Sequence, residues 1–329
     1  DDLDAALAAD KPGFATWKAP SAYDRSKILR QAAALMRERH DMISKVMVME
    51  QGKPYPEARA EVLVSADIID WYAEEGRRSY GRIVPGRVKG TRQLVMQEPV
   101  GIVAAFTPWN FPVLTPARKV GGALAAGCSL IMKASEETPG ACVEMVKCFA
   151  DAGLPAGVLN LVFGVPAEVS EHLMAKDAIK KISFTGSIPV GKHLAGLAAK
   201  TMKRVTLELG GKSPTIVFED ADIDHAIAGV LFGIFSSSGE SCIAGSRLFV
   251  HKKIHKEFMQ RLVEATKALR IGDPVDVKTQ MGPLISSSHR ASIESYVELG
   301  LKEGGKILRS KGIISFSGDD ERYVFRACT

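Results

Sequence analysis

The sequence is poor in the features that mark several common classes of protein. It holds only five cysteines in 329 residues, at scattered positions and with no Cys-x-x-Cys pair. An odd, scattered set argues against a disulfide framework and against a zinc site, and it favours a reducing, cytoplasmic compartment. No apolar run reaches the roughly 18 residues that a membrane-spanning helix needs. We therefore expect neither a membrane anchor nor a bound metal.

The chain also has little excess of one sign of charge. The formal net charge is +5, and the lysines and arginines form no block, so the sequence gives little support for a nucleic-acid partner. Hydrophobic residues make up 46% and charged residues 25% of the chain, as in ordinary globular domains. The length allows about two domains of roughly 150 residues each.

The first hundred residues predict helices and then a hairpin. Ser21 can cap a helix over residues 21–40, the next helix is broken at residues 51–54, and another is expected over residues 57–75. Glycine and proline then punctuate short extended pieces over residues 81–99, which predicts a projecting β-hairpin.

From residue 100 onward, buried apolar runs alternate with helical patterns. This alternation predicts a doubly wound parallel sheet with helices on its faces. Such sheets bind ligands beyond the carboxyl ends of their strands. We expect strands at 101–106, 129–132, 158–162 and 181–184, a domain boundary near residues 210–211, and further strands at 215–218 and 247–250 with helices after them.

One cysteine, Cys242, lies in a stretch of small residues from Phe235 to Arg247. Small neighbours leave room for a substrate to approach a reactive thiol, whereas most free cysteines are inert and buried. Taken alone, the stretch leaves both interpretations open.

Three motifs in order carry a resemblance to a known family. They are Thr107-Pro108-Trp109-Asn110-Phe111-Pro112, Leu207-Glu208-Leu209-Gly210-Gly211-Lys212-Ser213-Pro214 and Gly239-Glu240-Ser241-Cys242. With these motifs, residues 1 to about 308 resemble the aldehyde dehydrogenase superfamily, and residues 98–140 look most similar to enzymes of the succinate-semialdehyde type. The resemblance implies a Rossmann-like dinucleotide-binding domain over 1–80 and 100–210, an oligomerisation hairpin over 81–99, and a partial α/β catalytic domain over 211–329.

The resemblance also implies a chemistry. Cys242 would attack an aldehyde to form a thiohemiacetal, and the Asn110 amide with the Cys242 backbone N–H would stabilise the oxyanion. Glu208 would activate water to hydrolyse the thioester, and apolar neighbours are expected to raise its pKa toward neutrality. From the residues alone, Asn110 can equally be a turn residue and Glu208 an ordinary surface carboxylate.

The cofactor implied is NAD, with NADP less favoured because a carboxylate at Glu136 accepts ribose hydrogen bonds and repels a 2′-phosphate. The helix that opens after Gly186 offers backbone N–H groups to a pyrophosphate, although the sequence there is not Gly-x-Gly-x-x-Gly. By resemblance, the cofactor-binding residues are Thr107, Trp109, Lys133, Ser135, Glu136, Gly186, Ser187, Gly191 and Leu209.

The substrate is expected to be a small aldehyde, and the resemblance assigns a semialdehyde carboxylate to Arg118. A bidentate arginine suits a carboxylate. Enzymes of the succinate-semialdehyde type also place an arginine six residues before the catalytic cysteine, where this chain has Ser236. Arg118 can also be a plain helix-surface residue.

The likeness is expected to stop near Arg309, so the sequence reads as a fragment or as a chain with an altered tail at 309–329. By resemblance, the expected assembly is a homodimer or a homotetramer.

Two alternatives to hydrolytic aldehyde oxidation remain. One is a dehydrogenase that passes the acyl group to coenzyme A, which Glu208 disfavours. The other is a catalytically impaired chain that acts as a binding or scaffold protein.

Overall fold

The structure, a computed structural model, describes residues 2–308, 314–315 and 324–325. The chain divides into two compact units: residues 1–44 with 59–209, and residues 45–58 with 210–329. None of the helices in the described ranges is long and apolar enough to cross a membrane. The first unit contains α1 (Asp2–Lys18), α2 (Ala22–Glu38), most of α4 (Tyr55–Gly76), β1 (Arg82–Pro85), β2 (Arg92–Val95), β3 (Ile102–Phe106), α5 (Leu114–Ala125), β4 (Ser129–Lys133), α6 (Pro139–Asp151), β5 (Leu159–Val162), α7 (Pro166–Met174), β6 (Ile179–Gly186), α8 (Ile188–Ala199) and β7 (Arg204–Leu209).

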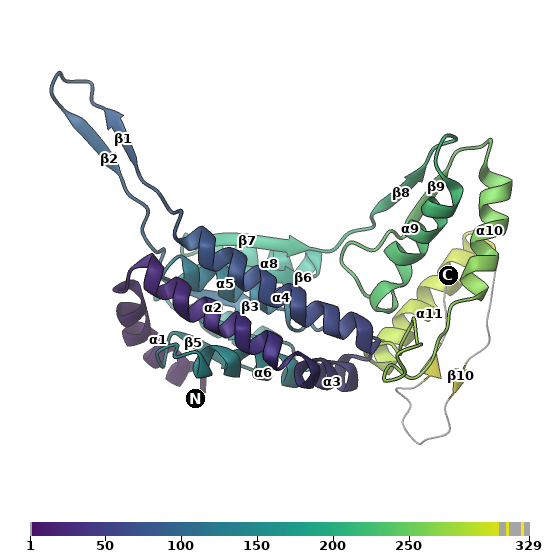
Figure 1. Cartoon of the computed structure of the whole chain (residues 1–329), viewed down its shortest axis with the longest axis horizontal. Helices are drawn as coiled ribbons and strands as arrows, with labels where there is room; N and C mark the ends of the chain where they lie inside the picture. Colours follow the sequence, from purple (N-terminus) through teal and green to yellow (C-terminus); the bar gives the residue numbers. More distant parts are fainter. Residues whose placement is uncertain (1, 309–313, 316–323, 326–329) are drawn as a thin grey trace. The chain divides into compact units, whose positions relative to one another are not determined.

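A five-stranded parallel sheet is the centre of the first unit (Figure 1). Its strand order is β5-β4-β3-β6-β7, so β3 lies in the middle. Every residue of β3 and β4 is buried, as expected for parallel strands covered on both faces. All five strands are parallel, but the order in which the chain adds them changes side at β3. Strands β4 and β5 follow on one side of β3, and β6 and β7 on the other. This is the position where doubly wound sheets bind ligands.

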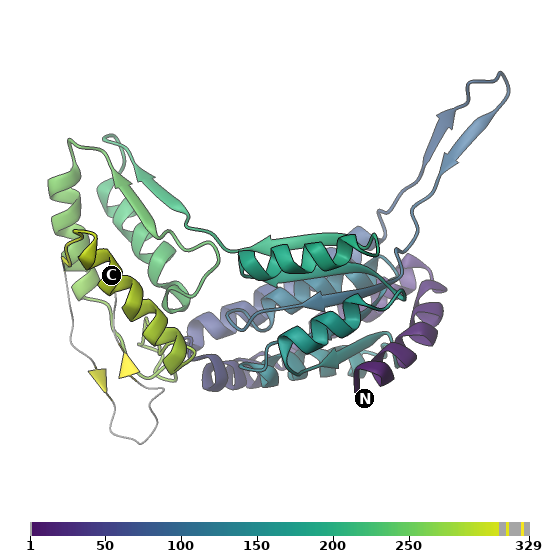
Figure 2. The ribbon, with the colours of Figure 1, turned by 180° about the vertical axis from the view of Figure 1, so that it is seen from behind.

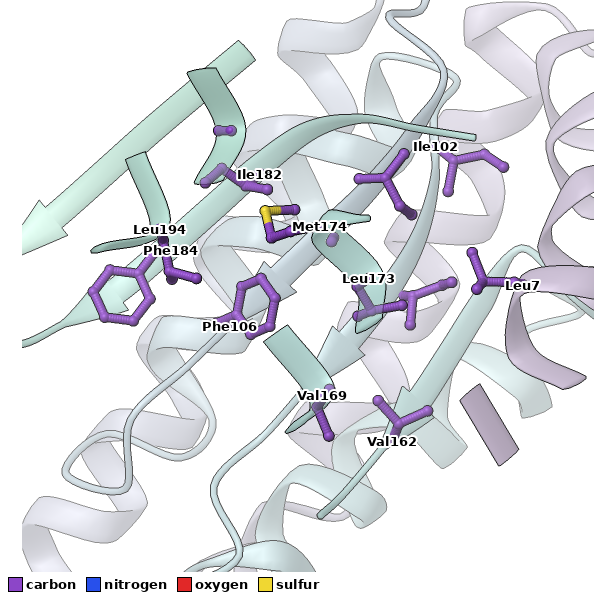
Figure 3. Packing of buried hydrophobic residues seen from close by; sticks show 14 of the residues in the cluster. Leu7, Ile102, Phe106, Val162, Val169, Leu173, Met174, Ile182, Phe184 and Leu194 are labelled. Atoms are coloured by element: carbon purple, nitrogen blue, oxygen red, sulfur yellow. The ribbon is translucent and has the colours of Figure 1, made fainter. Parts of the chain in front are cut away.

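Helices cover both faces of this sheet. Figure 1 shows α2 and α4 in front of it, and Figure 2, from behind, shows α8 in front. On the face of α1, α7 and α8, the sheet contributes one continuous apolar cluster, drawn in Figure 3, that includes Phe106, Ile182 and Phe184 with Leu173 and Leu194. On the other side, α2 packs against α5 and α6. The doubly wound parallel sheet predicted from the sequence is therefore confirmed.

Helix α1 was not anticipated from the sequence, and it packs against β4 and β5. Its approach is close, because a Cβ at Gly13 would lie 2.3 Å from the carbonyl oxygen of Gly157. The helix also buries a carboxyl group: Asp10 accepts hydrogen bonds from Ser129 Oγ at 3.0 Å and from Asn160 Nδ2 at 3.2 Å. Burial raises the pKa of Asp10 to about 7, and these two hydrogen bonds act in the opposite direction.

The hairpin predicted over residues 81–99 is present as the antiparallel pair β1 and β2, with Arg82 opposite Val95. All residues of both strands are exposed, among them Ile83 and Leu94, which are 71% and 70% exposed. An exposed apolar ribbon of this kind is typical of an association surface. Its role in oligomerisation stays a prediction.

The second unit is built around a short parallel pair. Strands β8 (Pro214–Val217) and β9 (Arg247–Val250) pair in parallel, and α9 (Ile223–Phe235) and α10 (His255–Lys267) pack together beside them around Phe258 and Val230. The 3₁₀ turn η1 (Ser236–Gly239) follows α9. Helix α11 (Ser287–Lys302), which the sequence analysis did not predict, and the two-residue strands β10 (Ile314–Ser315) and β11 (Val324–Phe325) complete it.

One division between the units falls at residues 209–210, and residues 45–58 belong to the second unit, whereas the sequence analysis grouped them with residues 1–80. The dinucleotide-binding and catalytic roles of the two parts stay predictions. Segment 45–58 includes the end of α3 (His40–Gln51) and the start of α4. The physical reason is a set of long-range hydrogen bonds, such as Tyr55 N to Pro274 O at 2.9 Å and Ser237 N to Glu57 Oε2 at 2.7 Å, which local sequence patterns do not reveal.

The buried acid in α1 gives a stability prediction. The folded-state pKa of Asp10, about 7, lies above its ordinary value of 3.8. The contribution of Asp10 to stability is therefore fully present below about pH 4 and is lost as pH rises through 7. Asp10→Asn keeps the size of the side chain and removes this titration. For a unit of about 200 residues, 1 kcal/mol shifts Tm by roughly 2–4 °C, so we expect the fall in Tm between pH 4.5 and pH 8 to be smaller by about 3 °C or more in Asp10→Asn.

Thermal unfolding followed by circular dichroism measures this difference. Asp177→Asn, at an exposed carboxylate of the same unit, is the matched control and should retain the wild-type dependence on pH. Equal pH dependence in Asp10→Asn and wild type would contradict the prediction.

Candidate active site

The carboxyl edge of the sheet gathers several of the predicted residues. Phe106 of β3 lies opposite Lys133 of β4 and Phe184 of β6, and Thr107 N donates to Lys133 O at 3.1 Å. Because β6 and β7 also run parallel, Gly186 lies opposite Leu209. The parallel register thus brings the ends of β3, β4, β6 and β7 to one edge.

Thr107 has a polar atom without a partner. Its Oγ1 is buried and makes no hydrogen bond within the described part of the chain. Buried hydroxyl groups in native proteins nearly always have a partner. At the end of β3, where doubly wound sheets bind ligands, this hydroxyl can serve a hydrogen-bonding group of a bound molecule.

Lys133, Ser135 and Glu136 follow β4. Lys133 is buried, and its Nζ forms an ion pair with Glu136 Oε2. Burial raises the pKa of Glu136, but hydrogen bonds from Lys133 and from its own backbone N–H outweigh burial, so the pKa lies below its ordinary value. Ser135 Oγ accepts from the backbone N–H of Glu137 at 3.3 Å. Glu136 is thus an ionised carboxylate at the edge of the sheet.

The start of α8 follows β6 at the same edge. Ser187 is its N-cap residue, and the Ser187 side chain makes no capping hydrogen bond. It therefore leaves the N–H groups of Ile188 and Val190, with their partial positive charge, to other partners. Gly191 lets the helix lie close to β7, because a Cβ there would be 2.7 Å from a methyl group of Leu209. A helix N-terminus of this kind suits an anionic group.

The turn that carries Trp109 and Asn110 links β3 to α5. Both residues are half-buried, and Trp109 O accepts a hydrogen bond from Thr138 Oγ1 at 3.4 Å. The turn is held in place by Glu61 of α4, a buried carboxylate that accepts from Val113 N at 2.9 Å and from Leu114 N at 3.0 Å. Glu61 therefore caps α5, whose N-cap residue provides no capping side chain.

Sequence reasoning missed both Glu61 and a second residue, Lys119. Lys119 is buried in α5, with its Nζ donating to Ser183 Oγ at 3.2 Å. Burial lowers the pKa of Lys119 to about 8, and the negative charge of Glu208 acts against this shift. The available signal was a lysine on the apolar face of an otherwise buried helix, nine positions after Asn110. Glu61 gave no signal, because its partners lie some fifty residues away.

Glu208 and Arg118 lie in the first unit, and both are exposed. The apolar surroundings that the sequence analysis expected for Glu208 are not found. Side chains alternate across β7, so Leu207 and Leu209 pack against the apolar cluster, whereas Glu208 points to the opposite face of the strand. The electrostatic coupling of Glu208 is instead to Lys119.

Cys242 lies in the second unit, after η1. It is exposed, whereas Cys128, Cys142 and Cys148, the other cysteines in the described ranges, are all buried. Burial raises the pKa of the Cys128 thiol and that of the Cys148 thiol, the latter to about 11. Cys242 thus has the accessibility that a nucleophile needs. Its grouping with Asn110 and Glu208 of the first unit stays a prediction.

The described residues contain no cluster of three or more His, Cys, Asp or Glu side chains arranged to hold a metal ion. The side chains at the predicted positions offer a thiol, carboxylates, an amide and a lysine of lowered pKa.

Known proteins provide an independent comparison. The chain is 44% identical over 310 residues to 4-(hydroxymethyl)benzenesulfonate dehydrogenase TsaD1 of Comamonas testosteroni, a match that covers 94% of the chain and 65% of that protein. It is 39% identical to succinate-semialdehyde dehydrogenase [NADP(+)] GabD of Escherichia coli, over 94% of the chain and 64% of the relative. The chain thus spans about two thirds or less of the length of these curated relatives.

Solved structures give the same result. An NAD-dependent aldehyde dehydrogenase from Sinorhizobium meliloti superposes with a TM-score of 0.95 at 35% identity, over 99% of the chain and 64% of that protein. The profile of the aldehyde dehydrogenase family matches residues 1–328. The match therefore extends beyond Arg309, where the sequence analysis expected the likeness to end; the structure of that tail lies largely outside the described residues. By its sequence and its fold, the chain belongs to the aldehyde dehydrogenase family.

Proposed function

We propose that this chain serves the NAD-dependent oxidation of an aldehyde to its carboxylic acid, with Cys242 as the nucleophile. The observation that carries the proposal is the exposed Cys242 thiol in a chain of this family that also retains Asn110 and Glu208. Each of the three residues has the chemistry that one step of the reaction needs.

A dinucleotide fits the carboxyl edge of the sheet. Thr107 Oγ1 offers an unused hydrogen-bonding atom, and the N-terminus of α8 beside Gly186 offers N–H groups to a pyrophosphate. The ionised Glu136 can accept hydrogen bonds from ribose hydroxyls and repel a 2′-phosphate, which favours NAD over NADP. When bound, the nicotinamide supplies an acceptor for hydride.

The first step is covalent. The Cys242 thiolate adds to the aldehyde carbon, which forms a C–S bond and moves the carbonyl electrons onto oxygen. The Asn110 side-chain amide and the Cys242 backbone N–H donate to this oxyanion, and the loss of one such donor costs about 3–4 kcal/mol. Glu61 holds the turn of Asn110 through the N–H groups of Val113 and Leu114. The thiohemiacetal then loses hydride and becomes a thioester.

Hydrolysis completes the cycle. Glu208 takes a proton from water, the resulting hydroxide adds to the thioester carbon, and the thiolate of Cys242 leaves as the acid forms. The negative charge of Glu208 acts on the buried Lys119 beside it, so a cation lies within electrostatic reach of the candidate base. A carboxylate that activates water favours the free acid over acyl transfer to coenzyme A.

The substrate we propose is an aldehyde with an anionic tail. The names of TsaD1 and GabD indicate a sulfonate and a carboxylate respectively, and Arg118 is an exposed cation eight residues after Asn110. A guanidinium suits either anion through paired hydrogen bonds. The second arginine of the succinate-semialdehyde type is absent at Ser236, so Arg118 would carry the recognition by itself.

Replacement of the nucleophile tests the reaction. In the protein as its gene encodes it, Cys242→Ala should abolish NADH formation from aldehydes, because no thiohemiacetal can form. The wild-type protein should give a higher kcat/KM with NAD than with NADP. Nicotinamide absorbance over a panel of aldehydes measures both. Ile243→Val, at an exposed neighbour, is the control, and undiminished activity in Cys242→Ala would rule out this mechanism.

Loss of the base should separate the two half-reactions. Glu208→Gln should still release a burst of about one NADH per Cys242 and then turn over roughly 10²–10⁴-fold more slowly, because general-base catalysis contributes about that factor. Rapid-mixing absorbance and the intact mass of an acyl-enzyme record the burst and the adduct. Glu168→Gln, at an exposed carboxylate of α7, should behave as wild type. If the burst disappeared together with turnover, Glu208 would act before hydride loss.

Charge removal tests the anionic tail. Arg118→Ala should lower kcat/KM for succinate semialdehyde by about 10–100-fold, since a charge-assisted hydrogen bond contributes roughly 1.5–3 kcal/mol. For butanal, which has no anionic tail, the change should stay within about twofold. Arg118→Lys keeps the charge without the paired geometry and should lie between wild type and Arg118→Ala. Equal losses for both aldehydes would contradict recognition of the tail.

A further inference from the structure

The loop that carries Cys242 has an unusual backbone. Ser237 and Ser238 have φ values of 49° and 56°, and Gly239 follows with a φ of 80°. Left-handed conformations are unfavourable for residues with a Cβ, and they persist only where surrounding contacts hold them. Two consecutive serines in this region therefore imply that neighbouring segments restrain the loop.

Two contacts hold the strained serines. The backbone N–H of Ser237 donates to Glu57 Oε2 at 2.7 Å, and Ser238 Oγ donates to Gly282 O at 3.0 Å. Glu57 belongs to the segment 45–58 and Gly282 to the loop before α11, and all of these residues are in the second unit. The loop is thus held from two directions before the chain reaches Cys242.

The third contact is made by Glu240, two residues before Cys242. Its Oε1 accepts from Ile285 N at 3.0 Å, and its Oε2 accepts from Gln51 Nε2 at 2.9 Å. Gln51 is oriented in turn, because its Oε1 accepts from Lys53 N at 2.9 Å. The Glu240 side chain is only 1% exposed. Its carboxyl group therefore joins the cysteine loop to the same two segments that hold the serines.

The charged groups around Glu240 come from each neighbouring segment. Lys53, itself 1% exposed, stabilises the Glu240 carboxylate electrostatically, and His289 of α11 places its Nε2 3.7 Å from Glu240 Oε1. Burial raises the pKa of Glu240 to about 8, while the N–H of Ile285, the charge of Lys53 and the amide of Gln51 act against the shift. Burial also lowers the pKa of His289.

We propose that Glu240 is a positioning residue for Cys242, which its carboxylate holds in place by accepting hydrogen bonds from Gln51 and Ile285 at the same time. The proposal rests on the proposed function, since it takes Cys242 as the nucleophile. An ionised carboxylate has an acceptor for both donors, whereas a protonated carboxyl or an amide presents one acceptor oxygen and one donor group. The restraint on the loop therefore strengthens as pH rises through the pKa of Glu240, and Glu240→Gln reproduces the weaker state at every pH.

Amide hydrogen exchange tests the restraint without any need for aldehyde oxidation. Peptides that cover residues 236–242 are compared between wild type and Glu240→Gln at the same pH, so that intrinsic exchange rates cancel. We expect exchange within about twofold of wild type at pH 6.5 and at least threefold faster than wild type at pH 9. Glu298→Gln, at an exposed carboxylate of α11, should match wild type at both pH values.

The alkylation rate of Cys242 by iodoacetamide, followed by mass spectrometry of the tryptic peptide 213–247, shows whether the restraint reaches the thiol. The wild-type to Glu240→Gln ratio of rates should change at least threefold between pH 6.5 and pH 9. An exchange ratio between wild type and Glu240→Gln that is the same at pH 6.5 and pH 9 would overturn the proposal, and so would a changed exchange ratio with a constant alkylation ratio.

If Glu240→Gln does not fold, Gln51→Met removes one donor instead. It should weaken the protection of residues 236–242 against exchange at pH 9, and unchanged protection would overturn the proposal. A protein that forms no NADH would contradict the proposed function and leave these measurements valid.

Discussion

The parallel pairing of β3 with two neighbours is the interaction on which the first unit depends. β3 accepts β4 on one side and β6 on the other, and its residues are buried on both faces. Parallel strands end at one edge, so the residues that follow them meet there whatever their separation in the chain. Thr107, Lys133 and Gly186 are neighbours for this reason alone. Phe106 and Phe184, which lie opposite each other on β3 and β6, both belong to the apolar cluster on one face of the sheet.

In the second unit, the loop from Ser236 to Cys242 precedes strand β9 and is held by contacts of another kind. Polar side chains provide the support instead. Glu57 and Glu240 accept backbone hydrogen bonds from the loop and from its neighbour at Ile285, and Glu61 does the same for the Asn110 turn in the first unit. A buried carboxylate can accept several N–H groups at once, which makes it well suited to a turn whose own backbone partners are missing. The cost is a group whose protonation responds to pH.

Sequence patterns predicted the sheet well, because the buried strands β3 and β4 are short apolar runs and helix α6 begins at a recognisable residue, Pro139. They also singled out Cys242 among small neighbours, and its thiol is exposed, while its role stays a prediction. They failed wherever a contact joins distant parts of the chain. The apolar alternation of β7 was visible in Leu207 and Leu209, yet only the sheet shows that Glu208 lies on the opposite face. Lys119, Glu61 and the placement of residues 45–58 depend on partners that no local window contains.

The chain passes between its two compact units three times, near residues 44, 58 and 209. A hybrid enzyme made by joining the front of one relative to the back of another at residue 210 would therefore combine a cysteine loop from one parent with Gln51 and Glu57 from the other. To exchange the whole second unit between relatives, two segments have to be replaced: residues 45–58 and the residues after 209. Segment 45–58 therefore has to come from the same parent as the Cys242 loop, although it is encoded almost two hundred codons upstream.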